Sequence, residues 1–261
     1  MNGTNRIKRE LSNDHVVLGC MVAEMRSPSI GMILESAGLD FFIIDMEHGS
    51  FNYETAADIL VASRCLDIVP FVRMPGIDRE PFQKMLDAGA CGLLIPRVET
   101  AAQVEAALDF MYYPPAGSRG LSLRRAHSGF GRPDPVEFTM NANNTIMLMV
   151  QIETRHGVEN LDSICTVPGI DVLFVGPSDL ARSYGDANSV DVQEAVHRVI
   201  RVGTAKGIAT GIHHSDLSYI NDLANEGMRF ISINTEVGAI IGTFTRTAAA
   251  IRTGTGQQTA G

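Results

Sequence analysis

The sequence predicts a single (β/α)₈ barrel, and three observations support this prediction. The chain has 261 residues, close to the roughly 250 that one such barrel typically contains. Short apolar runs alternate eight times with stretches of helical periodicity. Glycine directly follows four of the helical stretches, at Gly38, Gly89, Gly207 and Gly227, where it is preferred after a helix C-terminus. Two small domains would also fit the length, but no linker divides the chain.

The apolar runs are nearly continuous, as expected for parallel strands that are covered on both faces. The strands are expected at Val16–Val22, Phe41–Asp45, Val69–Arg73, Gly92–Pro96, Ile146–Ile152, Val172–Val175, Ala209–Ile212 and Phe230–Ile233. The helices are expected at Pro28–Ala37, Tyr53–Cys65, Arg79–Ala88, Ala101–Met111, Gly157–Cys165, Val192–Lys206, Leu217–Glu226 and Gly238–Arg252. Each strand is thus followed by a helix, which is the repeating unit of the barrel.

We expect one barrel domain over residues 1–252 and a disordered Gly/Thr/Gln-rich tail over residues 253–261, which is too polar to pack. The connection between Met111 and Ile146 is long enough to be functional or to contain small elements of its own. The polar segment Met1–Asp14 lacks the apolar core of a secretory signal. No apolar run is long enough to span a membrane.

Composition narrows the class of protein. Hydrophobic residues make up 45% and charged residues 20% of the chain, which is usual for a globular protein. The net charge is −9 and no basic stripe is present, so nucleic acid is not an expected partner. The four cysteines show no C-x-x-C spacing, which favours reduced thiols and a cytoplasmic location.

Polar residues gather where the predicted strands end, and that end of a barrel is where its chemistry lies. Strand two is followed by Asp45, Glu47 and His48, strand three ends in Arg73, strand five in Gln151 and Glu153, and strand six in Gly176–Asp179. The strand bodies carry almost no charge. We therefore expect a site at this rim. His213 and His214, after strand seven, have no partner at metal-ligand spacing and are interpreted as rim polarity.

Each candidate residue also has a structural interpretation. Glu153 and Asp179 suit a hard divalent cation, because two converging carboxylates repel each other without one, yet each could instead cap a helix or pair with an arginine. His48 suits proton transfer near neutral pH or simple hydrogen bonding in its loop. Arg73 could neutralise a substrate anion or pair with Asp45 or Glu47. The small-residue turn Gly176–Asp179 could bind an anion through its N–H groups, although such turns are common.

At these residues the sequence resembles the HpcH/HpaI family of class II pyruvate aldolases. The similarity runs in the family's order from about residue 16 to residue 250. The matching pieces are Asp45–His48, Val72–Arg73, Leu86–Ala90, Leu94–Pro96, Tyr113–Gly120, Val150–Thr154 and Phe174–Leu180. Any one of these pieces is weak evidence, whereas the set is specific.

The resemblance implies a pyruvate-type (β/α)₈ barrel that forms a homo-hexamer, a trimer of dimers with the last helix exchanged. It implies Mg²⁺ or Mn²⁺ as cofactor, with Co²⁺ or Zn²⁺ as alternatives. Each site residue takes a role from the family: Glu153 and Asp179 ligate the metal, Arg73 stabilises the enolate, His48 is the acid/base supported by Asp45 and by Asp87 of this chain or a neighbour, Gln151 positions water or substrate, and the segment Gly176, Pro177, Ser178 and Asp179 holds the pyruvate carboxylate.

The implied reaction is reversible, metal-dependent aldol cleavage of a 4-hydroxy-2-oxo acid to pyruvate and an aldehyde. No predicted strand ends in lysine, which argues against a Schiff-base mechanism. A decarboxylase or a macrophomate-synthase-like enzyme would use the same enolate and is the alternative. A CoA-ester lyase would need a basic groove for the CoA phosphates. A non-catalytic barrel that binds a keto acid is the alternative from another class.

Two segments depart from the family. Ile233–Glu236 stands where many relatives place an aspartate, and the loop Leu121–Ala126 is shorter than in the homoprotocatechuate-pathway enzyme. Both are expected to bound the aldehyde end of the substrate. Arg124 and Arg125 in that loop would favour an acidic aldehyde, while the physiological aldehyde stays open.

Overall fold

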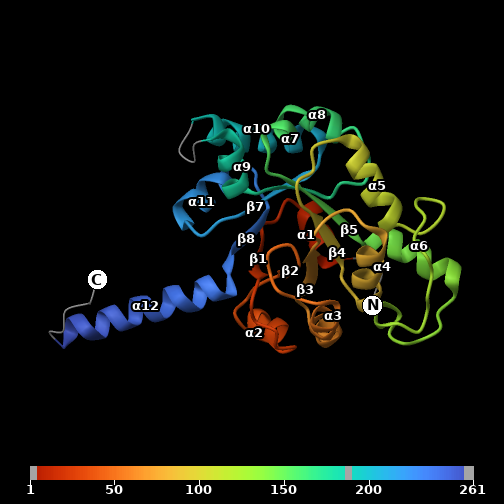
Figure 1. Cartoon of the computed structure of the whole chain (residues 1–261), viewed down its shortest axis with the longest axis horizontal. Helices are drawn as coiled ribbons and strands as arrows, with labels where there is room; N and C mark the ends of the chain where they lie inside the picture. Colours follow the sequence, from red (N-terminus) through yellow and green to blue (C-terminus); the bar gives the residue numbers. More distant parts are fainter. Residues whose placement is uncertain (1–4, 186–189, 256–261) are drawn as a thin grey trace.

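The computed structural model describes residues 5–185 and 190–255, and it confirms the predicted barrel. Eight parallel strands pair in chain order, and β8 pairs with β1 to close the sheet. Figure 1 shows the helices arranged around this sheet. The strands are β1 (Val17–Val22), β2 (Phe41–Asp45), β3 (Val69–Arg73), β4 (Gly92–Ile95), β5 (Met147–Ile152), β6 (Val172–Val175), β7 (Ala209–His213) and β8 (Phe230–Thr235).

All eight predicted strands are present, each within two residues of its expected ends. The α-helices are α1 (Arg6–Ser12), α2 (Ile30–Ser36), α3 (Tyr53–Ala62), α4 (Arg79–Ala88), α5 (Ala101–Met111), α6 (Pro135–Thr145), α7 (Arg155–Glu159), α8 (Leu161–Ile164), α9 (Pro177–Tyr184), α10 (Val190–Lys206), α11 (Leu217–Asn225) and α12 (Glu236–Gly254). Short 3₁₀ turns, η1 (Ser63–Cys65) and η2 (Ala126–Ser128), complete the list of helical elements in the described ranges.

Some helices differ from the sequence prediction. The patterns did not indicate α1, and they gave α9 only as a possible helix start near Asp179. The helix expected at Gly157–Cys165 is divided into α7 and α8. The long connection contains α6, one of the small elements allowed for there. Helix α12 extends to Gly254, two residues beyond the predicted domain end, and the tail from residue 256 lies outside the described residues.

The interior of the barrel is filled by alternate residues of the strands. Because successive side chains of a strand point to opposite faces, one set packs inside and the other against the helices. The ring of Phe41 stacks on that of Phe230 with centroids 4.0 Å apart. A Cβ at Gly19 would lie 2.2 Å from the Phe41 ring, so β1 needs glycine there to admit the ring.

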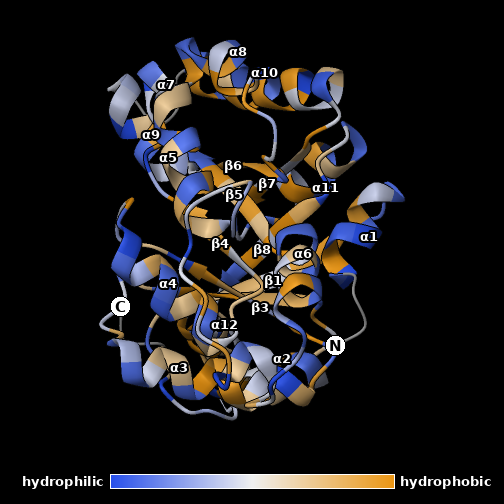
Figure 2. Cartoon of the chain, turned by 90° about the vertical axis from the view of Figure 1, so that its right-hand side faces the viewer, coloured by the Kyte–Doolittle hydropathy of each residue, from blue (hydrophilic) through white to orange (hydrophobic). Residues whose placement is uncertain are grey.

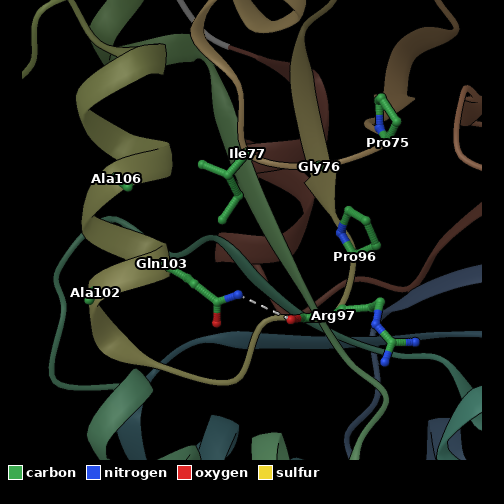
Figure 3. A pocket seen from close by; sticks show the side chains of 8 residues that line it. All are labelled: Pro75, Gly76, Ile77, Pro96, Arg97, Ala102, Gln103 and Ala106. Atoms are coloured by element: carbon green, nitrogen blue, oxygen red, sulfur yellow. Dashed lines mark hydrogen bonds between the residues drawn. The ribbon is translucent and has the colours of Figure 1, made fainter.

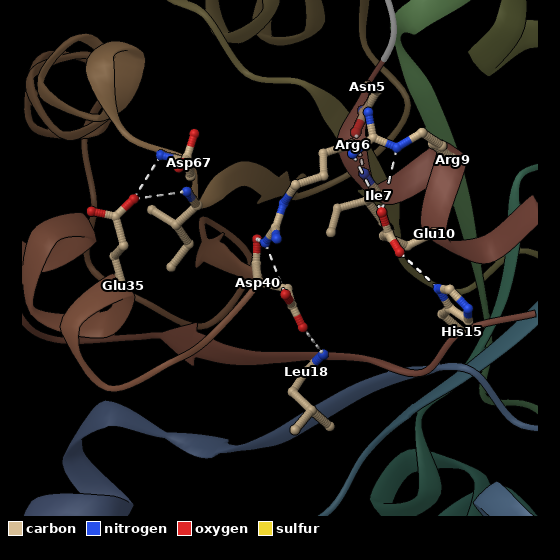
Figure 4. Close-up of polar contacts among 11 residues, drawn as sticks. Asn5, Arg6, Ile7, Arg9, Glu10, His15, Leu18, Glu35, Asp40 and Asp67 are labelled. Carbon is tan, nitrogen blue, oxygen red and sulfur yellow. Dashed lines mark hydrogen bonds and ion pairs between the residues drawn. The ribbon is translucent and has the colours of Figure 1, made fainter. Parts of the chain in front are cut away.

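Helix α1 closes the N-terminal end of the barrel. Asn5 donates through Nδ2 to the carbonyl oxygens of Cys91 and Thr145, and Arg6 pairs with Asp40 at 2.8 Å, contacts that Figure 4 shows in part. Ile7 is fully buried against the interior cluster. Since these partners all stand just before strands, the C-terminal ends of the strands form the open end.

The outer helices turn their apolar residues toward the sheet and their polar residues outward (Figure 2). Helices α6 and α12 are exceptions. Helix α6 has no buried residue. Helix α12 projects away from the barrel (Figure 1) and buries only Glu236. Its exposed side chains include four large apolar ones, at Ile240, Ile241, Phe244 and Ile251. In the described ranges, no helix is both long and apolar enough to cross a membrane. All four cysteines are free thiols.

Candidate functional site

The open end of the barrel is lined by side chains that continue the inward-facing rows of the strands. In β3 the apolar residues Val69 and Phe71 belong to the interior cluster, so Arg73, two positions on, also points inward. The same alternation turns Asp45 of β2, Gln151 of β5 and His213 of β7 toward the mouth. The sequence therefore builds a polar layer on top of an apolar one.

Arg73 and Asp45 form a bidentate ion pair in this layer. They are the last residues of neighbouring parallel strands and lie opposite each other in register. Arg73 donates from Nε to Oδ1 at 2.9 Å and from Nη2 to Oδ2 at 2.6 Å. Burial opposes ionisation of Asp45, but the hydrogen bonds and charge of Arg73 outweigh it and hold the Asp45 pKa below its ordinary value. The pair is thus a fixed, charged platform.

Glu47 and His48 follow Asp45 in the loop after β2. Their backbone N–H groups both donate to Asp45 Oδ1, at 3.1 and 3.2 Å. The Glu47 carboxylate lies 3.3 Å from Arg73 Nη1, and burial together with the charges of Asp45 and Asp179 raises its pKa. The His48 side chain is 67% exposed and its Nε2 lies 3.9 Å from Glu47 Oε2, so the imidazole is open to a bound molecule.

Glu153 is the most buried carboxylate of the candidate set, at 2% exposure. Its Oε1 accepts the Arg97 backbone N–H at 2.8 Å, and its Oε2 accepts Gln151 Nε2 at 2.5 Å. Burial raises the Glu153 pKa to about 7, and the negative charges of Glu47 and Asp179 contribute. Burial and the neighbouring carboxylates therefore outweigh the groups that stabilise the ionised form of Glu153, namely the Arg97 N–H and the charge of Arg73.

Gly176 lies beside Glu153 because β5 and β6 pair in register up to Ile152 and Val175. A Cβ at this position would lie 2.5 Å from Glu153 Oε2 and 2.7 Å from Gln151 Nε2. The chain then turns into α9, with Pro177 at its start and Asp179 in its first turn. Ser178 is exposed there. Helix α9 thus begins where the expected metal pair meets.

The residues present fit a divalent cation. Glu153, Asp179 and Glu47 interact unfavourably with one another, which a cation would reverse. Gln151 Oε1 is buried without a hydrogen-bond partner in the described chain. Across residues 5–185 and 190–255, no three Asp, Glu, His or Cys side chains group as a metal cluster. The two proposed carboxylate ligands leave the other positions to water or substrate oxygens.

Not every expected residue joins this layer within one chain. Asp87 lies near the end of α4, where it accepts a hydrogen bond from Arg119 Nη2 at 2.7 Å and has His127 3.7 Å away. The loop with Arg124 and Arg125 follows Gly120, which accepts from Gln83 of α4, and leads into η2, which also packs against α4. These residues lie on the flank of the barrel, so any role at the mouth would concern a neighbouring chain.

The sequence places three more residues near the ends of strands, but it does not predict their contacts. His213 is bound through Nδ1 to Ser232 at 2.9 Å, and burial, with the charge of Arg73, lowers its pKa to about 4. Arg97 contributes a backbone N–H to Glu153. Glu236 accepts the backbone N–H groups of Ala23, Glu24 and Met25, so its carboxylate anchors a rim loop. In the sequence, the position of Glu236 after strand eight is the one feature that indicates a place at the rim.

Comparison with known proteins agrees with this fold. The family model of HpcH/HpaI aldolase/citrate lyase matches residues 20–242. A hydroxypyruvate/pyruvate aldolase of Roseovarius nubinhibens is 36% identical over 96% of this chain and 98% of its own. A 5-keto-4-deoxy-D-glucarate aldolase of Escherichia coli K12 is 32% identical over 90% and 91%. The crystal structure of an HpcH/HpaI aldolase from Desulfitobacterium hafniense superposes with a TM-score of 0.89 at 28% identity, covering 94% of this chain and 96% of that one.

The matched range contains every candidate residue named above. The aldolase names of the relatives confirm the expected class of enzyme, a carbon–carbon lyase. With the barrel, the polar layer at its open end and a match over most of the chain, this protein is a member of the HpcH/HpaI aldolase/citrate lyase family.

Proposed function

We propose that this aldolase cleaves a 4-hydroxy-2-oxo acid to pyruvate and an aldehyde at a divalent metal ion held by Glu153 and Asp179. The observation that carries the proposal is the buried carboxylate Glu153, short of positive charge and bonded to Gln151, at the same mouth as the Arg73–Asp45 pair. A divalent ion, Mg²⁺ or Mn²⁺ by its oxygen ligands, supplies a Lewis acid for the negative charge that develops on the keto oxygen.

The chain's own residues bind the substrate and move its protons. The Arg73 guanidinium, fixed by Asp45, offers positive charge to the enolate oxygen. His48, exposed at the rim, removes the proton of the C4 hydroxyl during cleavage and returns it in the reverse direction. The N–H groups at Ser178 and Asp179, in the first turn of α9, suit the pyruvate carboxylate. Gln151 orients Glu153 and offers its free Oε1 to bound water.

Proton exchange of pyruvate tests this site without any aldehyde. In D₂O with Mg²⁺ or Mn²⁺, the wild type should exchange the pyruvate methyl protons, and chelation of the metal should stop the exchange reversibly. Glu153→Gln should slow it by roughly a hundred-fold or more, because a lost metal ligand costs more than the 10–100-fold typical of outer-shell partners. The signal is the loss of the methyl resonance in proton NMR spectra.

Glu159→Gln is the matched control, since Glu159 is exposed on α7 six residues further along. Its exchange rate should equal that of the wild type. Full exchange by Glu153→Gln would disprove the metal assignment. Rapid CO₂ release from oxaloacetate, with no aldol product from pyruvate and a range of aldehydes, would favour the decarboxylase alternative.

A homo-hexamer with the last helix exchanged, and a cytoplasmic location, are part of the same proposal. Helix α12 supports the assembly, because its exposed residues Ile240, Phe244 and Ile251 are spaced by four and seven positions and so form one apolar stripe. A second copy of the chain would bury this stripe. The location rests only on the composition and the free thiols.

A further inference from the structure

Arg97 joins the candidate metal site to a neighbouring cavity. It follows β4, and its backbone N–H is held by Glu153 Oε1 at 2.8 Å while its carbonyl oxygen accepts Gln103 Nε2 at 3.4 Å. Its φ is 52°, in the left-handed region that few non-glycine residues adopt. Strain of this kind persists where the surroundings impose it, which is common at binding sites. The backbone of Arg97 is therefore fixed relative to Glu153.

The cavity has a volume of about 530 Å³ and lies between the loops after β3 and β4. Its lining is mainly apolar: Pro75, Gly76, Ile77, Pro96, Arg97, Ala102, Gln103 and Ala106. Arg97 is the only charged residue of this lining. Figure 3 shows its side chain on the Pro96 side, pointing away from α5.

Within residues 5–185 and 190–255, the guanidinium of Arg97 has no partner of its own. Its side chain is exposed, and no hydrogen bond, ion pair or ring contact joins it to another residue in the described parts of the chain. By contrast, Arg73 and Arg119 are paired with Asp45 and Asp87. The protein has a net charge of −9, so an unpaired cation beside the proposed pyruvate site is unusual. Its guanidinium has the charge and geometry to bind a second carboxylate of the substrate.

The reaction places an anion within reach of this side chain. The aldehyde carbon must lie beside the methyl carbon of pyruvate, close to Glu153, and the rest of the aldehyde must extend toward the rim. The backbone N–H of Arg97 donates to Glu153, and the Arg97 side chain is exposed. An acceptor a few carbons long could therefore extend from Glu153 to the Arg97 guanidinium. Its apolar carbons would lie against Pro96 and the cavity wall.

We propose that Arg97 is the residue that selects the acceptor: its guanidinium binds a carboxylate at the far end of the aldehyde, so this enzyme prefers acidic aldehydes to neutral ones of equal length. The inference rests on the proposed aldol reaction at Glu153 and adds the substrate class to it. It also places the acidic preference on Arg97, in contrast to the sequence-based expectation for Arg124 and Arg125.

The test compares succinic semialdehyde with butanal, which have four carbons each and differ in the terminal carboxylate. Addition of pyruvate to each aldehyde is measured for the wild type and for Arg97→Gln. The ratio of kcat/KM for succinic semialdehyde to that for butanal should fall roughly ten- to hundred-fold in Arg97→Gln, as expected for the loss of one charge-assisted contact. Because both aldehydes meet the same variant, a general loss of activity cancels from the ratio.

Two further variants complete the experiment. Arg97→Lys should recover part of the ratio, because it keeps the charge but not the bidentate geometry. Arg124→Gln is the matched control, since Arg124 is also exposed, has a φ of 62° and lines a separate cavity. An unchanged ratio in Arg97→Gln, or an equal fall in Arg124→Gln, would overturn the inference. Absence of metal-dependent pyruvate exchange in the wild type would instead reject the proposed function itself.

Discussion

At the scale of single residues, the position of the Glu153 carboxylate depends on the backbone segments that lie close to it. Gly176 lets β6 pass beside the carboxylate of Glu153, and the Arg97 N–H holds the other oxygen of the same group. Main chain thus confines the carboxylate on two sides, and the Gln151 side chain donates a hydrogen bond to its Oε2.

Gly176→Ala tests this close approach. The new Cβ would lie 2.5 Å from Glu153 Oε2, so Glu153 must move, and we expect metal affinity to fall by about ten-fold or more. Isothermal titration with Mn²⁺ measures the change directly. Gly254→Ala, where a Cβ meets no atom within 4 Å, should bind Mn²⁺ as the wild type does. Unaltered affinity in Gly176→Ala would mean that Glu153 is not a ligand.

The sequence predicts the positions of some residues at the mouth but not of others. The placement of Asp45, Arg73, Gln151 and Glu153 together followed from their positions at the ends of strands, because barrel geometry brings those ends to one rim. The backbone contact of Arg97 could not be predicted, since any residue type can donate an N–H and the positive φ leaves no mark on an arginine. Asp87 shows the opposite case, because its distance from the mouth depends on the packing of α4.

At the scale of elements, the start of α12 is tied to the loop after β1. The Glu236 carboxylate is 4% exposed and accepts three consecutive backbone N–H groups, from Ala23 to Met25, at 2.6 to 2.9 Å. It also lies in the first turn of α12, where the helix dipole favours a negative charge. One side chain therefore fixes both a helix and a loop at the open end.

Glu236→Gln should destabilise the fold by about 2 kcal/mol, because hydrogen bonds to a charged group are stronger than neutral ones. In addition, the NH₂ group of glutamine would face backbone N–H groups, which cannot accept a hydrogen bond. Urea unfolding followed by circular dichroism gives the free energy of unfolding. Glu137→Gln is the control, since Glu137 also lies in the first turn of a helix but is exposed. It should change stability by less than about 0.5 kcal/mol. Equal effects would show that only the dipole matters.

The sequence predicts a helix or strand well where the hydrophobic period and the length of the segment indicate the same element. Buried strands of four to six residues give continuous apolar runs, and these were located closely. The sequence indicates only a possible helix start near Asp179, and not the length of α9, because Gly176 and Pro177 have the composition of a turn, although proline is favoured at the first position of a helix. The sequence allows for small elements in the long connection but does not locate α6, because none of its residues is buried and no apolar period marks it.

At the scale of the whole molecule, α12 has no residue after Glu236 buried against the barrel. Its 19 residues project from the sheet, and Phe244 is 69% exposed. An apolar stripe of this kind is characteristic of a surface that another chain covers. The sequence predicted the helix from its period, but its direction could not be predicted, because the pattern gives an apolar face and not the chain against which that face packs.

Phe244→Asp should dissociate the proposed hexamer while leaving the barrel folded, since a charge placed in an apolar interface is costly and on an exposed surface is not. Size-exclusion chromatography with light scattering gives the mass of the assembly. Ala250→Asp puts the same charge on another side of the exposed helix and should leave the mass unchanged. A monomeric wild type, or a variant that assembles like it, would contradict the exchange of α12.

The anchorage of Glu236 would couple the proposed assembly to the mouth of the barrel. Helix α12, which a neighbouring chain would cover in that assembly, begins at the carboxylate that accepts the N–H groups of Ala23, Glu24 and Met25 at the rim. A change in the tilt of α12 about the end of β8 would therefore be transmitted to this rim loop through three short hydrogen bonds. Contact between subunits and the shape of the opening through which substrate enters would then change together.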